Sequence, residues 1–147
     1  MTENSQPEAQ IFTLAEANAK LPQVRRVLTR LQQLQQAMVD SQRECEALTA
    51  SLAEGNGHSR RALQDQLDAG RAHQDQLIAE MDTALRELDA CGALLKDPAV
   101  GLVDFYSRRA GELIFLCWRL GEAERIGFWH TLEGGFAGRQ PVDSLIQ

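Results

Sequence analysis

The chain has 147 residues, of which 44% are hydrophobic and 24% charged, and its formal net charge is −6. This length fits one domain with a buried core, and no apolar run approaches the ~20 residues that a membrane span needs. The acidic balance argues against nucleic acid as a partner, because contact with phosphates needs a concentrated basic face.

The first residues lack the basic and apolar parts of a signal peptide. They predict a short disordered tail over residues 1–12 of a cytoplasmic protein. The cysteines are odd in number and lie in apolar contexts, which fits a reducing compartment and free thiols. These cysteines are Cys45, Cys91 and Cys117.

Two helical arms follow, the first over residues 13–54 and the second over 59–92. Thr13 and Glu16 have the spacing of a capping box, which begins a helix. Pro22 lacks an amide hydrogen, so it either kinks the first arm or opens a separate long helix.

Each arm carries an apolar seam with alternating three- and four-residue steps, which is typical of a coiled coil. The seam residues are Val24, Val27, Leu31, Leu34, Met38, Ser41, Cys45, Leu48 and Leu52 on the first arm, and Leu63, Leu67, Gly70, Gln74, Leu77, Met81, Ala84, Leu88 and Cys91 on the second.

The two seams match each other when the chain folds back at residues 55–58. One register then places Leu34 against Met81 and also pairs the two polar seam residues, Ser41 and Gln74. The sequence therefore predicts a long, coiled-coil-like antiparallel helical hairpin.

The last third of the chain changes its pattern. Three runs rich in β-branched, aromatic and leucine residues lie within residues 99–132, separated by turn-like intervals, and predict a three-stranded antiparallel β-meander. Three strands need a packing partner, and the arms are most apolar at their open end, so we expect the meander to pack there. Residues 133–147 read as a C-terminal loop and tail. The predicted fold is thus α+β, with residues 13–147 forming a single domain.

Several short motifs in the chain resemble a bacterial family known as domain of unknown function 2203. The resemblance covers nearly the whole chain and implies a helical region followed by a C-terminal signature, with no established activity to carry over. The motifs are residues 11–18 (IFTLAEAN), 96–97 (KD), 101–105 (GLVDF), 116–122 (LCWRLGE), 129–130 (WH) and 135–141 (GFAGRQP).

Five residues of this C-terminal part are candidates for a site: Asp104, Cys117, Glu122, His130 and Arg139. A thiolate, an imidazole and a carboxylate are established ligands of zinc and iron. Whether they converge depends on strand register. If Cys117 lies opposite His130 the two share a face, whereas a one-residue slip sends His130 to the other face.

Two further interpretations of these residues are open. In the first, His130 activates Cys117 as a low-pKa nucleophile, and Arg139 with the amides around Gly134 stabilises developing charge. In the second, Arg139 only pairs with Asp104 or Glu122 and the cluster is structural.

The sequence as a whole favours a non-enzymatic interaction or scaffold protein without a cofactor. We expect a homodimer formed through the hairpin, because Gly70 beside Cys45 would leave a thin layer that a second hairpin could fill. The alternative is a metal- or small-ligand-binding protein, and in one version an enzyme, with zinc or iron at Cys117 and His130.

Overall fold

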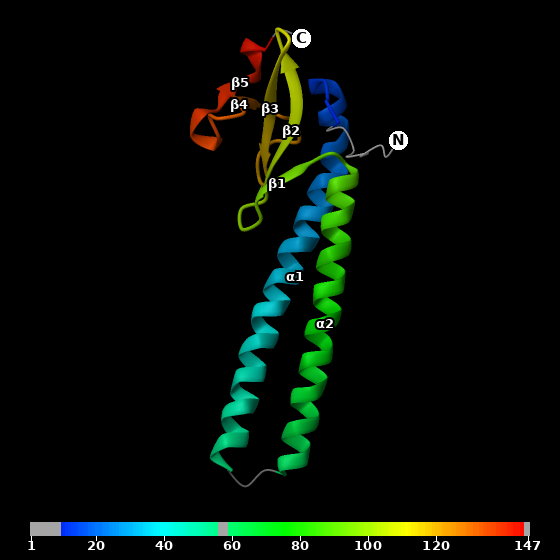
Figure 1. The fold of residues 1–147 in the computed structure, drawn as a ribbon, viewed down its shortest axis with the longest axis vertical. Coiled ribbons are helices and arrows are strands. Elements are labelled where there is room, and N and C mark those ends of the chain that lie inside the picture. The colour runs from blue at the N-terminus through cyan, green and yellow to red at the C-terminus, as the bar shows by residue number, and fades with distance from the viewer. Residues whose placement is uncertain (1–9, 56–58, 146–147) are drawn as a thin grey trace, which may run out of the picture. The chain divides into compact units, whose positions relative to one another are not determined.

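The structure is a computed structural model that describes residues 10–55 and 59–145 (Figure 1). Two long helices are followed by strands of one antiparallel sheet, so the fold is α+β with a helical hairpin. Residues 56–58 of the predicted hairpin turn lie outside the described residues. The elements are α1 (Leu14–Glu54), α2 (Arg60–Ala90), β1 (Leu94–Asp97), β2 (Leu102–Arg109), β3 (Glu112–Arg119), β4 (Phe128–Thr131) and β5 (Gln140–Pro141), with short 3₁₀ turns at Phe136–Gly138 and Val142–Ser144.

The described chain divides into two compact units. The hairpin unit comprises residues 30–55 and 59–85, and the sheet unit comprises residues 10–29 and 86–145. Helices α1 and α2 each contribute to both units. Each unit is described by itself below.

Helix α1 begins at the predicted capping box. The backbone N–H of Thr13 donates to Glu16 Oε1 at 3.0 Å, and the N–H of Glu16 donates to Thr13 Oγ1 at 3.2 Å. The hydrogen bond from Thr13 lowers the pKa of Glu16 from its ordinary value, because it stabilises the carboxylate. The helix continues through Pro22, so Pro22 does not open a separate helix.

The hairpin unit has the register that the seams predict. Gln74 Nε2 donates to Ser41 Oγ at 3.3 Å and lies equally close to Cys45 Sγ. A Cβ at Gly70 would lie 2.7 Å from Cys45 Sγ. The pairing of the two polar seam residues is therefore confirmed, but the layer at Gly70 is not thin, because the Cys45 thiol fills the space beside it.

The sheet has five strands in the order β1-β2-β3-β4-β5, and the prediction of three was wrong. The predicted meander corresponds to the central strands, β2 to β4. The missed strands are short edge strands, whose four and two residues are too few to show an alternating pattern. Strand β2 also runs into the first of the turn-like intervals, residues 107–111, and ends at Arg109. Ala110 and Gly111 then make a tight turn with φ values of 51° and 81°.

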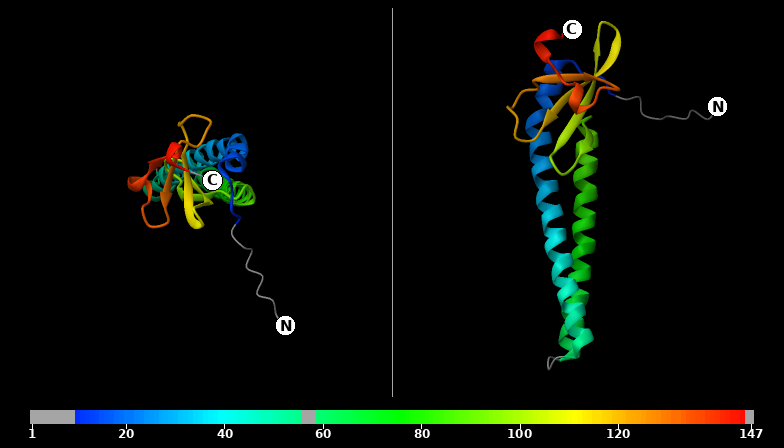
Figure 2. Two further views of the ribbon diagram at one scale, coloured as in Figure 1. Left: turned by 90° about the horizontal axis from the view of Figure 1, so that it is seen from above. Right: turned by 90° about the vertical axis from the view of Figure 1, so that its left-hand side faces the viewer.

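One face of the sheet packs against the N-terminal segment and the start of α1. Phe12 stacks edge-on against Phe105 with the ring centroids 5.3 Å apart, and the backbone N–H of Ile126 donates to Asn18 Oδ1 at 2.7 Å. Both views of Figure 2 show the blue start of α1 beside the sheet. Phe12 is 2% exposed. It lies at the end of the predicted tail, most of which falls outside the described residues.

Gly92 lies two residues beyond the end of α2 in the left-handed conformation that glycine commonly adopts after a helix, with φ at 79°. A Cβ at this position would overlap the Phe12 ring. Gly55, after α1, is also left-handed, with φ at 63°, but a Cβ there would meet nothing within 4 Å.

We expect Gly92→Ala to lower the free energy of unfolding by about 2–4 kcal/mol, because it combines a left-handed alanine with displacement of Phe12. Gly55→Ala, the matched control, should cost only the conformational part, about 1–2 kcal/mol. Urea unfolding of both variants measures the difference. Equal losses would show that Phe12 is not held against Gly92.

Candidate metal site

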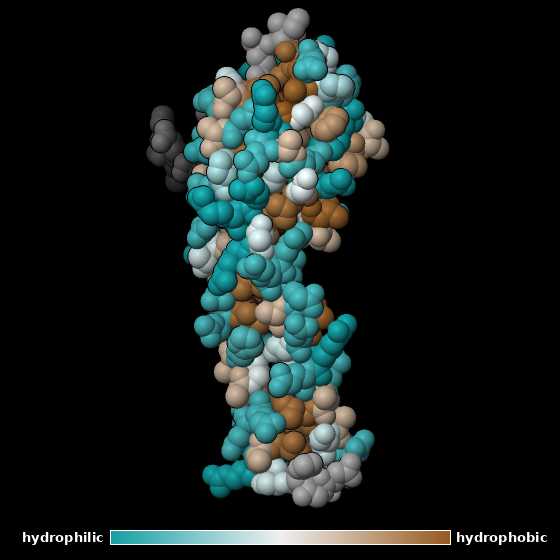
Figure 3. Space-filling model, turned by 180° about the vertical axis from the view of Figure 1, so that it is seen from behind, coloured by the Kyte–Doolittle hydropathy of each residue, from teal (hydrophilic) through white to brown (hydrophobic). Residues whose placement is uncertain are grey.

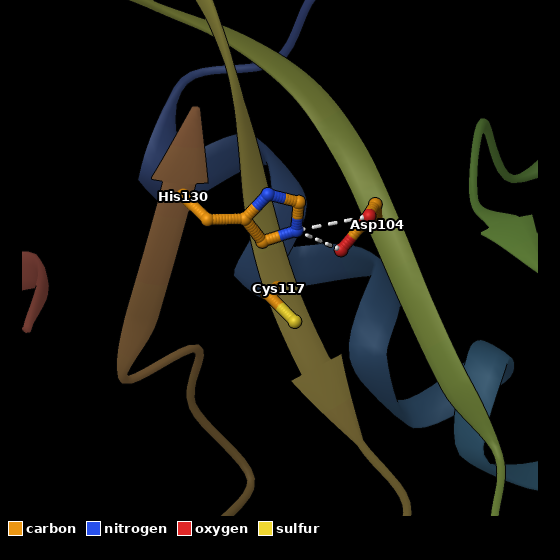
Figure 4. A group of neighbouring side chains, drawn as sticks. All are labelled: Asp104, Cys117 and His130. Carbon is orange, nitrogen blue, oxygen red and sulfur yellow. Dashed lines mark hydrogen bonds and ion pairs between the residues drawn. The ribbon is translucent and has the colours of Figure 1, made fainter. Parts of the chain in front are cut away.

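Strand register brings three of the five predicted site residues onto one face of the sheet. Asp104 of β2 pairs with Cys117 of β3, and Cys117 pairs with Phe128 of β4. His130 lies two residues beyond Phe128 on β4 and therefore shares its face. Cys117 therefore lies opposite neither His130 nor Trp129. His130 is nevertheless on the same face of the sheet as Cys117, so the two side chains can converge. Figure 4 shows the three side chains pointing toward one another from three neighbouring strands.

The cluster is compact and buried. One ligand atom from each of Asp104, Cys117 and His130 lies within 4.8 Å of the other two. His130 Nε2 is 3.1 Å from both carboxylate oxygens of Asp104. The three residues are 2%, 0% and 3% exposed. Phe105, which contacts Phe12, points to the opposite face, so the cluster lies on the face that does not carry Phe105.

A backbone carbonyl holds the second ring nitrogen of His130. Nδ1 lies 2.7 Å from the backbone carbonyl oxygen of Thr131, and because a carbonyl only accepts, Nδ1 must carry the hydrogen. Nε2 faces the Asp104 carboxyl at 3.1 Å, and because two lone pairs would repel each other, this contact needs one hydrogen between the two groups. A metal ion would take the place of that hydrogen. A histidine that donates one N–H to a backbone carbonyl and directs the other nitrogen into a cluster is arranged as a metal ligand.

Cys117 is a thiol in the metal-free protein. Burial, which is the largest cause, and the negative charge of Asp104 together raise its pKa to about 12, although Arg139 acts in the opposite direction. The predicted low-pKa nucleophile is therefore wrong, because burial and the neighbouring Asp104 carboxylate both disfavour the thiolate.

Glu122 and Arg139 pair with each other at the border of the cluster. Arg139 Nη2 donates to Glu122 Oε1 at 2.7 Å, as the structural interpretation of Arg139 allows. The same carboxylate oxygen accepts the backbone N–H of Arg119, also at 2.7 Å. The Arg139 guanidinium lies over the Phe128 ring, 4.0 Å from its centroid, and Nη2 is 3.5 Å from the Cys117 carbonyl oxygen. Neither residue belongs to the three-ligand cluster.

Two contacts that complete the site gave no signal in the sequence. The acceptor for His130 is a backbone carbonyl, which every residue has. The Phe115 ring lies 5.4 Å from the His130 ring, and Lys96 Nζ lies 4.6 Å from the Phe115 centroid. An alternating strand pattern shows which residues share a face, but it does not show which side chains cover a particular histidine.

The raised pKa of Cys117 predicts a loss of stability in alkali. Its folded value of about 12 lies above the ordinary 9.0, so its contribution is complete below pH 9 and is lost as the pH rises toward 12. Between pH 9 and pH 10.5 the metal-free protein should lose about 2 kcal/mol of unfolding free energy relative to Cys117→Ala. Urea unfolding at both pH values measures this loss, and parallel pH profiles for the two proteins would contradict it.

Comparison with known proteins identifies a family but no function. Among the described residues, no helix combines the length and the apolar character needed to cross a membrane. No curated protein and no solved structure matches the chain. Residues 10–142 match the family of uncharacterised conserved proteins DUF2203, as the resemblance of the motifs predicts. The chain therefore belongs to the DUF2203 family.

Proposed function

We propose that this protein binds a zinc ion through Asp104, Cys117 and His130. The observation that carries the proposal is the convergence of these three buried side chains within 4.8 Å, with His130 Nδ1 held by a carbonyl. Carboxylate, thiolate and imidazole are all zinc ligands, and three protein ligands leave a fourth position for water or another small ligand.

The distances and charges suit zinc. Bonds of 2.0–2.3 Å in a tetrahedral site place ligand atoms about 3.3–3.7 Å apart, close to the 3.1 Å between His130 Nε2 and the Asp104 oxygens. A divalent ion would displace the thiol proton of Cys117 and the hydrogen between His130 and Asp104. It would be balanced by one thiolate and one carboxylate, so the buried site would be neutral. The cluster has a single histidine, so it lacks the two-histidine, one-carboxylate set typical of non-haem iron, and its thiolate favours zinc.

Titration with Co²⁺, a spectroscopic substitute for zinc, tests the proposal. We expect saturation at one ion per chain, visible bands of tetrahedral cobalt, and a near-ultraviolet thiolate-to-cobalt band that Cys45→Ala retains. Cys45 lies in the hairpin unit and is the matched control. The absence of a saturable thiolate band in the wild-type protein would contradict the proposal.

Self-association through the hairpin is a second candidate function, supported by exposed apolar side chains on the hairpin unit. Val39, Ile78 and Leu85 are 40%, 55% and 44% exposed. Ile78 and Leu85 are seven residues apart and so share one side of α2. Figure 3 shows apolar surface between the polar side chains along the helices.

We expect a dimer at micromolar concentration, because pairing two such surfaces removes apolar area from water. Ile78→Lys should convert it to a monomer in sedimentation equilibrium, whereas Asp82→Lys, a change of exposed charge on the same helix, should not. A single 16.3 kDa species for the wild-type protein at high concentration would contradict this role.

A further inference from the structure

The segment between β4 and β5 borders the cluster on its own face of the sheet. We call residues 132–139 the cover segment. Its last residue, Arg139, lies over Phe128, which pairs with Cys117 and points to the same face as the cluster. Arg139 Nη2 also approaches the Cys117 carbonyl oxygen. Both ends of the segment are anchored, by the hydrogen bond from Gly134 N–H to Thr131 Oγ1 and by the pairing of Phe128 with Pro141.

Few contacts hold the middle of the cover segment down. Its 3₁₀ turn, Phe136–Gly138, contains no buried residue, and Phe136 is 44% exposed although its ring lies 4.7 Å from the Arg139 guanidinium. Gly135, with φ at 58°, has the conformational freedom of a hinge. The segment is linked to β3 by the Arg119 guanidinium, which lies 5.5 Å from the centroid of the Phe136 ring, and to the turn after β3 by the ion pair between Arg139 and Glu122.

Burial of Arg139 in this ion pair is partly unfavourable, because one nitrogen of its guanidinium lacks a hydrogen-bond partner in the described part of the chain. The Arg139 side chain is 10% exposed, and its Nε is buried with no hydrogen-bond partner among the described residues. A buried donor without an acceptor is costly, so the closed position of Arg139 depends strongly on Glu122. An ion cannot reach ligands that are 0–3% exposed unless something covering them moves.

We infer that the cover segment is a lid over the Asp104–Cys117–His130 cluster, latched by the Glu122–Arg139 ion pair, and that its opening admits and releases the metal ion. The inference rests on the proposed zinc site for its purpose. The movement itself can be measured without metal, because the Cys117 thiol is accessible only when the lid opens.

The test is alkylation of the metal-free protein with iodoacetamide, followed residue by residue by mass spectrometry. Glu122→Gln removes the charge of the latch but keeps an oxygen that accepts the Arg119 N–H. We expect Cys117 to react about tenfold faster in this variant, while Cys91, which is 2% exposed, keeps its rate. Glu124→Gln is the matched control, since it breaks an exposed ion pair of the same unit, with Arg25, and should change neither rate.

An unchanged Cys117 rate in Glu122→Gln would overturn the lid. If the alkylation of Cys91 becomes faster together with that of Cys117, the variant unfolds globally, and Phe136→Ala then serves as the test variant. Faster alkylation of Cys117 alone in Phe136→Ala supports the lid, and any other result overturns it.

Metal release gives a second measurement. With Co²⁺ bound and an unchanged absorption spectrum, Glu122→Gln should lose the ion to excess EDTA about tenfold faster than the wild-type protein. If the wild-type protein binds no metal but Cys117 is selectively accelerated in Glu122→Gln, the lid stands and the zinc proposal is removed. If the wild-type protein binds metal but Cys117 labelling is unchanged in Glu122→Gln, the zinc proposal stands and the lid is removed.

Discussion

Cys117→Ser will lower the affinity for zinc by about a hundredfold or more, an effect larger than that of losing a hydrogen-bond partner of a ligand. The serine hydroxyl matches the thiol in shape but does not ionise to supply an anionic ligand. Cys117 lies at the centre of the cluster, 0% exposed and paired directly with Asp104. Competition against a chromophoric chelator at constant pH measures the affinity.

The matched control is Cys91→Ser, which changes a second buried thiol of the sheet unit. Its affinity should stay within about twofold of the wild-type value, since its effect on binding is indirect. Asp104→Asn and His130→Gln should each reproduce the loss seen with Cys117→Ser. Wild-type affinity in Cys117→Ser would show that the thiol is not a ligand.

Leu34→Ala will lower the free energy of unfolding by about 2–5 kcal/mol, because it empties a buried position of the hairpin seam. Leu34 is 3% exposed. Val39→Ala on the same helix is the control, since Val39 is 40% exposed and should change stability by about 0.5 kcal/mol or less. Urea unfolding followed by the helical circular dichroism signal measures both. A loss below about 1 kcal/mol for Leu34→Ala would place this layer outside the core.

The helical hairpin was predictable because its pattern is long and redundant. Each arm repeats the three- and four-residue steps over many turns, so a single irregular position does not hide the period. The polar pair was the most informative part, since the hydrogen bond between Gln74 and Ser41 tests the register directly.

The edge strands were not predictable in the same way. Leu94 and Leu95 directly follow the predicted second arm and continue its apolar character, but in the structure they pair with Asp104 and Val103. Gln140–Pro141 becomes a strand only through pairing with β4. Strands this short are defined by the neighbour they pair with and not by their own side chains.

The site was predictable as a set of residue types but not as an arrangement. The sequence contains carboxylates at Asp104 and Glu122, and either could accompany Cys117 and His130. Pairing of β2 with β3 brings in Asp104, while Arg139 and the Arg119 N–H occupy Glu122. Strand register and backbone hydrogen bonds thus determine which carboxylate joins the cluster, and neither can be deduced from the composition or from the spacing of residues.

Metal content is the most direct test of the zinc site. The protein should be purified without an affinity tag and without chelators, and analysed by inductively coupled plasma mass spectrometry alongside Cys117→Ser. The account predicts close to one zinc per chain in the wild-type protein and almost none in the variant. Equal metal content in the two proteins, or no metal in either after dialysis against zinc, would contradict it.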